Sequence, residues 1–279
     1  MIEKIINRFP DDEKPKRKEL VSLLSKFKSE HSKGKISFPG GDIESGDRYF
    51  ITDGFFPYYF SQKKRILFIL RETRYLYDGG VLKKQHENPC CLESIFCHHE
   101  NNMIRGNTVF RRLFYIAYGV KTEGRLPFEE AKKSFNDFAP QFAIEGGFSF
   151  AFMELSKYSN EEDSGFIANR DLISQFFQNS NLHKRNFIRQ EIELLSPDVI
   201  ITGSLWDDRV IDESFRTSVF GNPKKIPGKS SDYAAYFEIT IGNKKTPIIN
   251  LSSFPARRKD KDCYYDPVMS ILFRKGGRK

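Results

Sequence analysis

Glu72 stands two residues after an unbroken apolar run, Ile66 to Leu70. A short run that is apolar on both faces is typical of a central strand in a parallel sheet, because helices cover both sides of such a sheet. Ligands and catalytic groups in open α/β sheets collect at the carboxyl ends of these strands. The position therefore makes Glu72 a candidate catalytic carboxylate. The alternative is a loop carboxylate that contacts only water.

Two later apolar segments, 148–153 and 247–251, also lead into polar sequence. The first is followed by Glu154, and the second by a turn at residues 252–258 that ends in two arginines. Because the carboxyl ends of parallel strands meet at one edge of a sheet, we expect Glu72, Glu154 and this turn to line one rim. Carboxylates beside cations at such a rim could hold a polar ligand and stabilise charge that develops during a reaction.

A different kind of chemistry is suggested by four metal-ligating side chains close together, Cys90, Cys97, His98 and His99. Cys and His are the usual ligands of zinc, but structural zinc sites favour paired ligands with a second pair downstream, which is missing here. A zinc-dependent nuclease built on these residues is our third hypothesis about function. The first two require no metal, and we expect no cofactor.

The charge of the chain is concentrated at its two ends. The net charge is +8, of which residues 1–35 carry +4 and residues 256–279 carry +5, so that the middle is close to neutral at −1. Basic ends on a neutral body indicate contact with a polyanion, most simply nucleic acid. Termini that serve only solubility are the alternative.

Length and composition bound the class of protein. At 279 residues the chain can bury a core in one large domain or two small ones. No apolar run reaches the length of about 18 residues that suggests a membrane span, and the first residues do not resemble a signal peptide. Four cysteines in a chain of this length do not indicate a disulfide framework. We therefore expect a cytoplasmic protein that contacts no membrane; nothing in the sequence indicates its oligomeric state.

The periodicity of apolar residues predicts a three-layer α/β/α fold with a central, mostly parallel, four-stranded sheet. The expected strands include a C-terminal hairpin and lie at 66–70, 148–153, 198–203, 236–241 and 247–251. The expected helices lie at 13–33, 109–118, 128–138, 169–195, 204–216 and 266–274. The helix at 13–33 has a basic outer face. We divide the chain into a basic helical extension, 1–45, and an α/β domain, 46–279.

The order of these segments resembles the uracil-DNA glycosylase superfamily. In that family a first strand ends in a motif such as G-E-A-P-G, a middle strand ends in N-L-x-K, a P-x-V-I-x-x-G strand follows, and the last strand leads into an H-P-S or H-P-A loop. The matching segments here are, in the same order, Leu70-Arg-Glu-Thr73, Met153-Glu-Leu-Ser-Lys157, Ser196-Pro-Asp-Val-Ile-Ile-Thr-Gly203 and Leu251-Ser-Ser-Phe-Pro-Ala256. The resemblance covers roughly residues 50–270 and depends on order more than on any one motif.

Four positions depart from the family pattern. Arg71 stands where the family has a glycine, and Glu154 stands where it has a base-reading Asn. Phe254 replaces a His that donates to the leaving base, and Tyr158 replaces the Cys of the iron–sulfur members. Phe cannot donate a hydrogen bond to the leaving base, and losing one such donor typically costs about 3–4 kcal/mol of transition-state stabilisation. Ser253 is the candidate replacement donor, with Ser252 or a nearby Arg as alternatives; without such a donor the protein would be a slow enzyme or none. The Tyr leads us to expect no iron–sulfur cluster.

The resemblance implies an enzyme that flips a base out of DNA and cleaves its N-glycosidic bond. Glu72 would stabilise positive charge at the sugar or orient the attacking water. An ionised Glu154 accepts well from the exocyclic amine of cytosine but opposes O4 of uracil, so we predict a preference for cytosine or a modified cytosine. Such bases occur in the DNA of some phages, so the role could be repair or antiviral defence. The alternative is that Glu154 pairs with Lys157 or Arg71 and never meets a base.

The remaining candidate site residues are expected to lie at the same rim of the sheet. Base contacts are assigned to Arg71, Tyr75, Glu154 and Phe254, and DNA contacts to Lys157, Arg257, Arg258, Lys259 and Lys261. A solvated basic turn is the alternative for the last four. The rival function is a catalytically inactive protein on the same fold that binds nucleic acid or a nucleotide. The missing His favours this rival, and the retained Glu72 favours the enzyme.

Overall fold

The computed structural model describes residues 8–37, 43–46, 50–74, 77–78, 81–82, 108–160, 170–181, 186–206, 211 and 213–273. Its helices are α2 (Lys14–His31), α5 (Thr108–Lys121), α6 (Phe128–Lys133), α7 (Phe135–Phe138), α8 (Arg170–Asn181), α9 (Phe187–Leu195), α10 (Glu213–Phe220) and α11 (Asp266–Phe273). Shorter elements are β1 (Lys35–Ser37), β2 (Ile43–Ser45), β5 (Tyr77–Asp78), β6 (Val81–Leu82), the helical turns η2 (Ala139–Gln141) and η3 (Pro227–Lys229), and the π-helical turn η4 (Lys261–Tyr265). None of the described helices is long and apolar enough to cross a membrane.

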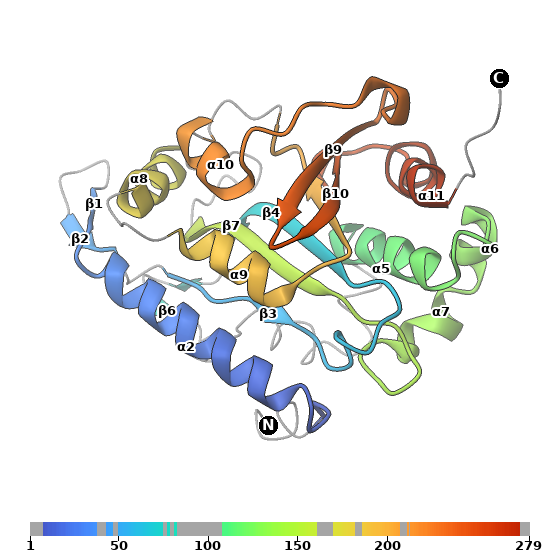
Figure 1. Ribbon diagram of the computed structural model, residues 1–279, viewed down its shortest axis with the longest axis horizontal. Helices are drawn as coiled ribbons and strands as arrows, with labels where there is room; N and C mark the ends of the chain where they lie inside the picture. The colour runs from blue at the N-terminus through green and yellow to red at the C-terminus, as the bar shows by residue number, and fades with distance from the viewer. Residues whose placement is uncertain are drawn as a thin grey trace.

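A mixed sheet of six strands forms the middle layer (Figure 1). From edge to edge its strands are β3 (Gly54–Phe55), β7 (Ala151–Asn160), β4 (Ile66–Arg74), β8 (Val199–Gly203), β10 (Lys244–Leu251) and β9 (Ala234–Ile241). The four inner strands run parallel, whereas β3 and β9 pair antiparallel at the two edges. The α/β class is confirmed, but the predicted count of four strands is too small, because the expected hairpin strand joins the sheet as β9 and the unpredicted β3 pairs with β7 at the other edge.

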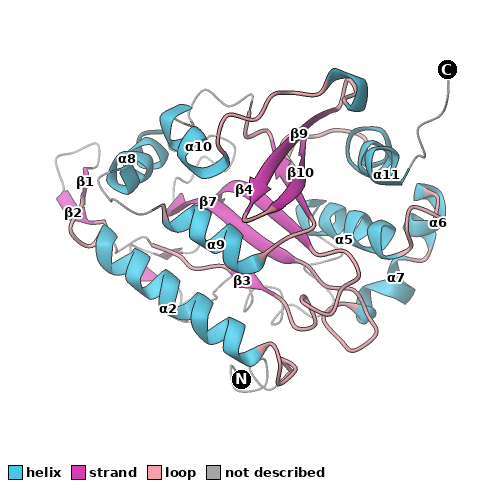
Figure 2. Ribbon diagram, in the orientation of Figure 1, coloured by secondary structure: helices cyan, strands magenta, loops and turns pink. Residues whose placement is uncertain are grey.

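Helices cover both faces of this sheet (Figure 2). On one face α2, α8, α9 and α10 pack over alternate strand residues such as Leu67, Met153 and Ile200. On the other face α5, α6, α7 and α11 pack over the residues between them, such as Phe68 and Phe152. Side chains alternate across a strand, so each inner strand supplies apolar residues to both cores. This is why its sequence is an unbroken apolar run rather than an alternating one.

Strands β4 and β7 continue beyond their predicted ends as a pair. β4 pairs with β8 only as far as Ile69, whereas its pairing with β7 joins Leu70 to Glu154 and Glu72 to Ser156. The ladder hydrogen bonds satisfy the backbone of both strands, and this does not depend on apolar side chains. Glu154 therefore lies within a strand, and the prediction that it follows the strand's end is wrong.

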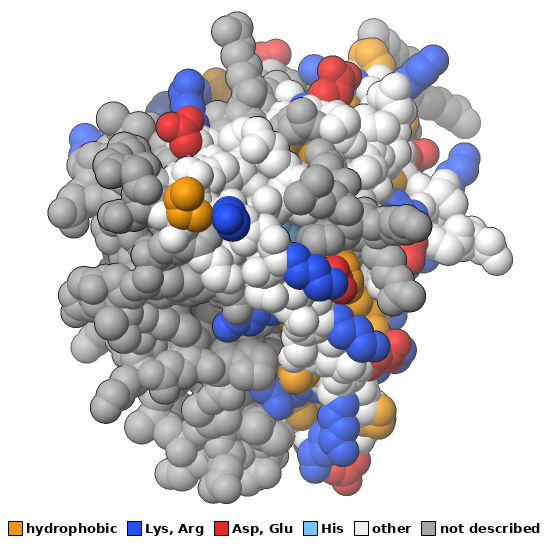
Figure 3. Space-filling model, turned by 90° about the vertical axis from the view of Figure 1, so that its left-hand side faces the viewer, with side chains coloured by type: hydrophobic (Ala, Val, Ile, Leu, Met, Phe, Trp, Pro, Cys, Tyr) orange, Lys and Arg blue, Asp and Glu red, His pale blue; other side chains and the backbone are white. Residues whose placement is uncertain are grey.

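The helix predicted at 13–33 is confirmed as α2, and it is part of the domain's core. Its residues Leu20, Leu24 and Phe27 are buried in the same cluster as the sheet residues. The outer side chains of α2 are basic and partly paired with neighbouring acids, as in the contact of Lys16 with Glu19. Figure 3 shows Lys and Arg side chains down the side of the molecule it presents, with Asp and Glu among them.

Local capping explains where the predicted helices divide. The segment predicted as one helix at 169–195 forms α8 and α9, because the side chain of Asn186 accepts from the backbone N–H of Arg189 and starts a new helix. Ser196 ends α9 with a left-handed φ of 45°, just before Pro197. The helices expected at 109–118 and 266–274 are confirmed as α5 and α11. The one expected at 204–216 overlaps α10 at residues 213–216, and positions 207–210 and 212 of this segment lie outside the described residues.

Candidate functional site

The strand order places a topological switch point between β4 and β8. After β4 the chain adds β7 on one side and then crosses to add β8 and β10 on the other. Adjacent strands whose connections leave in opposite directions form a crevice outside their carboxyl ends, and this is where open α/β sheets bind ligands. The candidate site is therefore the rim formed by the carboxyl ends of β4, β8 and β10, the same edge that the sequence predicts.

The ends of β8 and β10 are fixed to each other by side-chain hydrogen bonds. Asn250 Oδ1 accepts from Thr202 Oγ1 at 2.8 Å and from the backbone N–H of Leu205 at 2.9 Å. The backbone N–H of Ser204, whose φ is 57°, donates to the carbonyl of Leu251 at 2.8 Å. A Cβ at Gly203 would meet the ring of Phe254 at 2.9 Å, so a glycine lets the two strand ends approach this closely.

Arg112 of α5 holds the turn that follows β10. Its side chain is buried and donates to the carbonyls of Phe254, Ala256 and Arg258, the last two at 2.8 Å. Its Nε donates to Asp260 Oδ1 at 2.7 Å, and its guanidinium lies 4.0 Å from the centre of the Tyr264 ring. The turn therefore wraps around one cation. Sequence reasoning missed this residue, although an Arg within the apolar helix predicted at 109–118 was a signal that it could have a buried partner.

The predicted basic contacts of this turn differ in their surroundings. The side chains of Arg257, Arg258 and Lys259 are exposed, and neither arginine forms an ion pair with a described residue. Lys261 pairs with Asp266 and lies 3.9 Å from Asp262. Because Arg112 draws the carbonyls of the turn inward, the two arginine side chains remain at the surface. They are available to a polyanion, whereas the charge of Lys261 is partly compensated.

Phe254 is part of the hydrophobic core, with no exposed surface. Its ring centre lies 6.2 Å from that of Phe68 and 5.5 Å from that of Tyr264. The base contact predicted for this side chain is therefore not available in the structure, because an aromatic side chain at this position fills the space beneath the turn. Ser253 is half-buried, and its carbonyl accepts from the Tyr264 hydroxyl at 2.7 Å. Its role as a donor stays a prediction.

Lys157 belongs to a buried cluster of charges on the other face of the sheet. Its Nζ lies 2.6 Å from both carboxylate oxygens of Asp53 and 3.0 Å from Glu191 Oε2, and none of the three side chains has exposed surface. The predicted contact of Lys157 with DNA is therefore wrong in this structure. Neither Asp53 nor Glu191 was singled out from the sequence.

This cluster has one carboxylate more than it has ammonium groups. Burial, and after it the neighbouring charge of Asp53, raises the pKa of Glu191 well above its ordinary value. Burial opposes the charge of Lys157, but the charges of Asp53 and Glu191 outweigh it and raise the pKa of Lys157. A proton retained on the carboxylate pair makes the cluster neutral, which is the expected state of charges away from water.

Glu154 lies close to this cluster through its backbone. Its N–H donates to Asp53 Oδ2 at 2.6 Å, and only 3% of its surface is exposed. The alternative in which Glu154 pairs with Lys157 is not supported, because that lysine pairs with Asp53 and Glu191, whereas the alternative with Arg71 stays a prediction. Glu154 thus lies beneath the rim rather than on it, and its contact with a base stays a prediction.

Arg71 is half-buried at the rim, and the backbone of Glu72 lies in β4. The side chain of Glu72 is outside the described part of the structure. The same holds for Tyr75 and for the zinc candidates Cys90, Cys97, His98 and His99. Within the described residues, no group of three His, Cys, Asp or Glu side chains is arranged to hold a metal ion.

No family model matches this chain, and neither a curated protein nor a solved structure matches it. The likeness to uracil-DNA glycosylases therefore depends on the order of motifs in the sequence alone.

Proposed function

We propose that this protein binds DNA across the carboxyl edge of its sheet and hydrolyses the N-glycosidic bond of one base. The observation that carries the proposal is the turn held by Arg112. It leaves Arg257 and Arg258 exposed without acidic partners among the described residues, next to the switch point of the sheet. Arginines are well suited to phosphate, because their planar guanidinium can form two parallel hydrogen bonds to it.

The catalytic part of the proposal depends on Glu72. β4 extends past the last residue paired with β8, so the backbone of Glu72 lies at the carboxyl end of β4, paired with Ser156 of β7. Cleavage of an N-glycosidic bond builds positive charge on the sugar, and a nearby carboxylate stabilises that charge or orients the attacking water. The motif resemblance assigns this role to Glu72, and the proposal is supported by the strand order, since ligands of open α/β sheets bind at the carboxyl ends of the strands.

The base preference is proposed from Glu154. An ionised carboxylate accepts from the exocyclic amine of cytosine, and it lacks the donor that would match O4 of uracil. Since Glu154 is almost fully buried, a flipped base would have to enter beneath the rim to reach it. A cytosine or modified cytosine is accordingly the proposed target, and repair or antiviral defence is the proposed setting.

A second candidate is DNA binding without catalysis. It is favoured by the core position of Phe254, which can supply no hydrogen bond to a departing base. The loss of one such donor typically lowers the rate by a factor of roughly 10²–10³. The basic turn would serve this candidate as well as it serves the enzyme.

Base release and DNA binding must be measured separately to distinguish the two candidates. We would incubate the protein with duplexes that carry uracil, cytosine or hydroxymethylcytosine and detect abasic sites by alkaline cleavage. Binding would be followed by fluorescence anisotropy. For the enzyme, Glu72→Gln should reduce release by at least about a hundredfold and leave binding unchanged. Glu145→Gln, which removes an exposed carboxylate, is the matched control.

Each outcome has a distinct meaning. Faster release of uracil than of either cytosine would contradict the role of Glu154. Binding by the wild type without release of any base would establish the second candidate. Arg257→Gln and Arg258→Gln should each reduce the slope of log affinity against log salt by about one, as expected for one phosphate contact. Unchanged salt dependence in both variants would exclude the turn as the DNA contact.

A further inference from the structure

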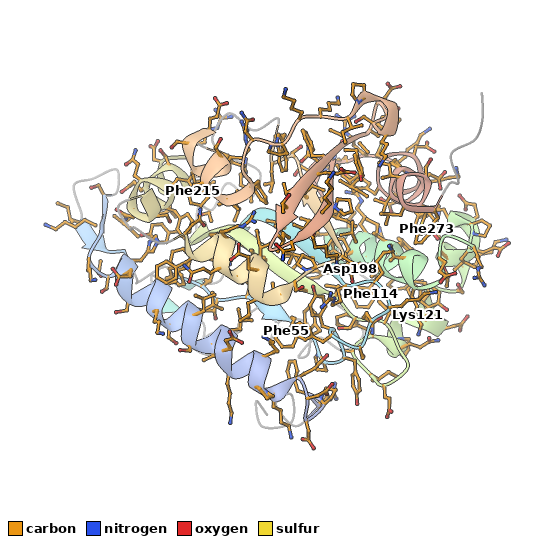
Figure 4. The ribbon with its side chains drawn as sticks, viewed as in Figure 1. Phe55, Phe114, Lys121, Asp198, Phe215 and Phe273 are labelled. Carbon is orange, nitrogen blue, oxygen red and sulfur yellow. The ribbon has the colours of Figure 1, made fainter. Side chains whose placement is uncertain are left out.

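A cavity of about 490 Å³ lies at the opposite edge of the sheet from the proposed DNA site. It is bounded by the segment before β4, the C-terminal half of α5 and the end of α11. Figure 4 labels Lys121 of α5 and Phe273 of α11, which lie at the same end of the molecule. A volume of this size is in the range of sites that bind small molecules.

The lining of the cavity divides into an apolar and a charged part. The apolar part consists of five side chains, Ile66, Ala117, Val120, Leu272 and Phe273. The charged part includes three lysines and one carboxylate, Lys63, Lys64, Lys121 and Glu123. Binding sites for small molecules typically combine a mainly apolar wall with a few polar groups that orient the ligand.

The carboxylate at the cavity is already neutralised. Glu123 accepts from Lys63 and from Arg125, the latter at 2.6 Å, and the hydrogen bond from Lys63 is the main reason that its pKa is lowered. Its negative charge is therefore balanced before any ligand arrives. The charge that the cavity offers to a ligand comes from the other two lysines.

Lys64 and Lys121 have no carboxylate partner within the described chain. The ammonium group of Lys64 lies 6.0 Å from the ring centre of Phe273, and that of Lys121 donates to the carbonyl of Gly146. The Lys121 side chain is exposed, but partial desolvation of its ammonium group lowers its pKa, and an anion placed beside it would offset this effect. Two cations without a compensating acid beside an apolar wall are suited to an anion that carries an apolar body.

The carboxyl end of α5, which lies beside Lys121, does not prevent an anion from binding. The carboxyl end of a helix carries partial negative charge on its last carbonyls. At the end of α5, however, the carbonyls of Tyr118, Gly119 and Val120 accept from the backbone N–H groups of Thr122, Gly124 and Glu123. The carbonyls are thus satisfied internally, and Lys121 in the last turn supplies the compensating positive charge.

We propose that this cavity binds a small amphipathic anion, with its carboxylate or phosphate at Lys64 and Lys121 and its apolar body against Val120, Leu272 and Phe273. The site is separate from the carboxyl edge of the sheet and does not depend on the DNA function proposed there. A fatty acid and a nucleotide are two sources of this chemistry.

Two matched pairs of probes test the proposal by calorimetric titration of the full chain. The pairs are octanoate with octanol, and uridine monophosphate with uridine; inorganic phosphate alone is a fifth probe. We expect at least one anion to bind about tenfold or more tightly than its neutral partner and than phosphate. Octanoate binding would identify the fatty-acid type of ligand, and uridine monophosphate binding the nucleotide type.

Variants connect the binding to the cavity. Lys64→Gln and Lys121→Gln should each reduce the affinity for the anion about tenfold. Lys224→Gln, which removes an exposed positive charge elsewhere, should leave this affinity unchanged. Leu272→Trp should reduce affinity by filling the apolar part. Thermal unfolding of each variant confirms that it is folded. The proposal is overturned by no binding of either anion, by equal binding of a neutral partner, or by undiminished affinity in the lysine variants.

Discussion

Arg112 and Lys157 are buried cations on opposite faces of the sheet, and their partners differ in kind. Lys157 is bound by two side-chain carboxylates, from the segment before β3 and from α9. Arg112 is bound mainly by three backbone carbonyls of one turn. A compact ammonium suits closely placed carboxylates, whereas the planar fork of a guanidinium can address several carbonyls at once. The first arrangement connects elements of the core, and the second sets the path of a surface turn.

The comparison shows how a buried charge can serve either stability or surface presentation. Removing Lys157 would leave two carboxylates away from water, so its effect should be on the whole fold. Removing Arg112 would leave the carbonyls of Ala256 and Arg258, which lie near the surface and can turn towards water, so its effect should be concentrated in residues 254–258. Three variants test this difference.

The largest effect is expected for Lys157→Met. Breaking a buried ion pair by removing one partner typically costs about 3–5 kcal/mol, because the remaining charge stays buried. We expect a loss of unfolding free energy of about this size, measured by urea denaturation. The control is Lys33→Met, which removes a lysine that is 66% exposed and paired with Glu30, and should cost less than about 1 kcal/mol. Equal losses in the two variants would mean that the buried cluster is not stabilised by its ion pairs.

A smaller effect is expected for Arg112→Lys. Lysine keeps the positive charge but cannot reach three carbonyls and Asp260 together, so we expect a loss of about 2 kcal/mol from unsatisfied groups. Amide hydrogen exchange should become faster in residues 254–258 without a comparable change in α9. The proposed DNA binding should also weaken, because the exposed arginines would no longer be held in place.

The control for this variant is Arg125→Lys, at a surface arginine that is 80% exposed. It should change the unfolding free energy by less than about 0.5 kcal/mol. Exchange that accelerates throughout the sheet in Arg112→Lys would show that this arginine supports the fold as a whole. The contrast with Lys157 would then not hold.

Lys157 and Arg112 also show which parts of the structure the sequence could predict and which it could not. Residues 153–156 alternate between apolar and polar, a pattern that indicates a continuing strand, whereas the motif match predicts that Glu154 follows the strand. The alternation also puts Lys157 on the same face as Met153 and Leu155. Its partners were not predictable, because the Asp53 that binds it is 104 residues away and no local pattern joins them. The partners of Arg112 lie 142 or more residues later, for the same reason. Apolar runs identified β4, β8 and β10 because burial on both faces is visible locally.

The smallest effect at acidic pH is expected for Glu191→Gln, and its change with pH tests the charge state of the Lys157 cluster. The pKa of Glu191 is raised from its ordinary value of 4.5 by burial and by Asp53. Between pH 4.5 and the pKa in the folded protein, the folded chain keeps a proton that the unfolded chain has released. The unfolding free energy contributed by this group therefore falls as the pH rises, by at most about 1.4 kcal/mol per pH unit. A glutamine side chain at this position would be neutral throughout and would lack this dependence.

We accordingly expect Glu191→Gln to be within about 1 kcal/mol of the wild type near pH 4.5 and to become relatively more stable as the pH rises. Urea denaturation from pH 4.5 to 8 measures the difference. Glu193→Gln is the matched control, since its side chain is on the same helix but 47% exposed and should show no such trend. A constant difference for Glu191→Gln over this range would mean that Glu191 is ionised in the folded protein. The buried cluster would then carry a net charge of −1. Lys157 would be paired with two ionised carboxylates instead of one.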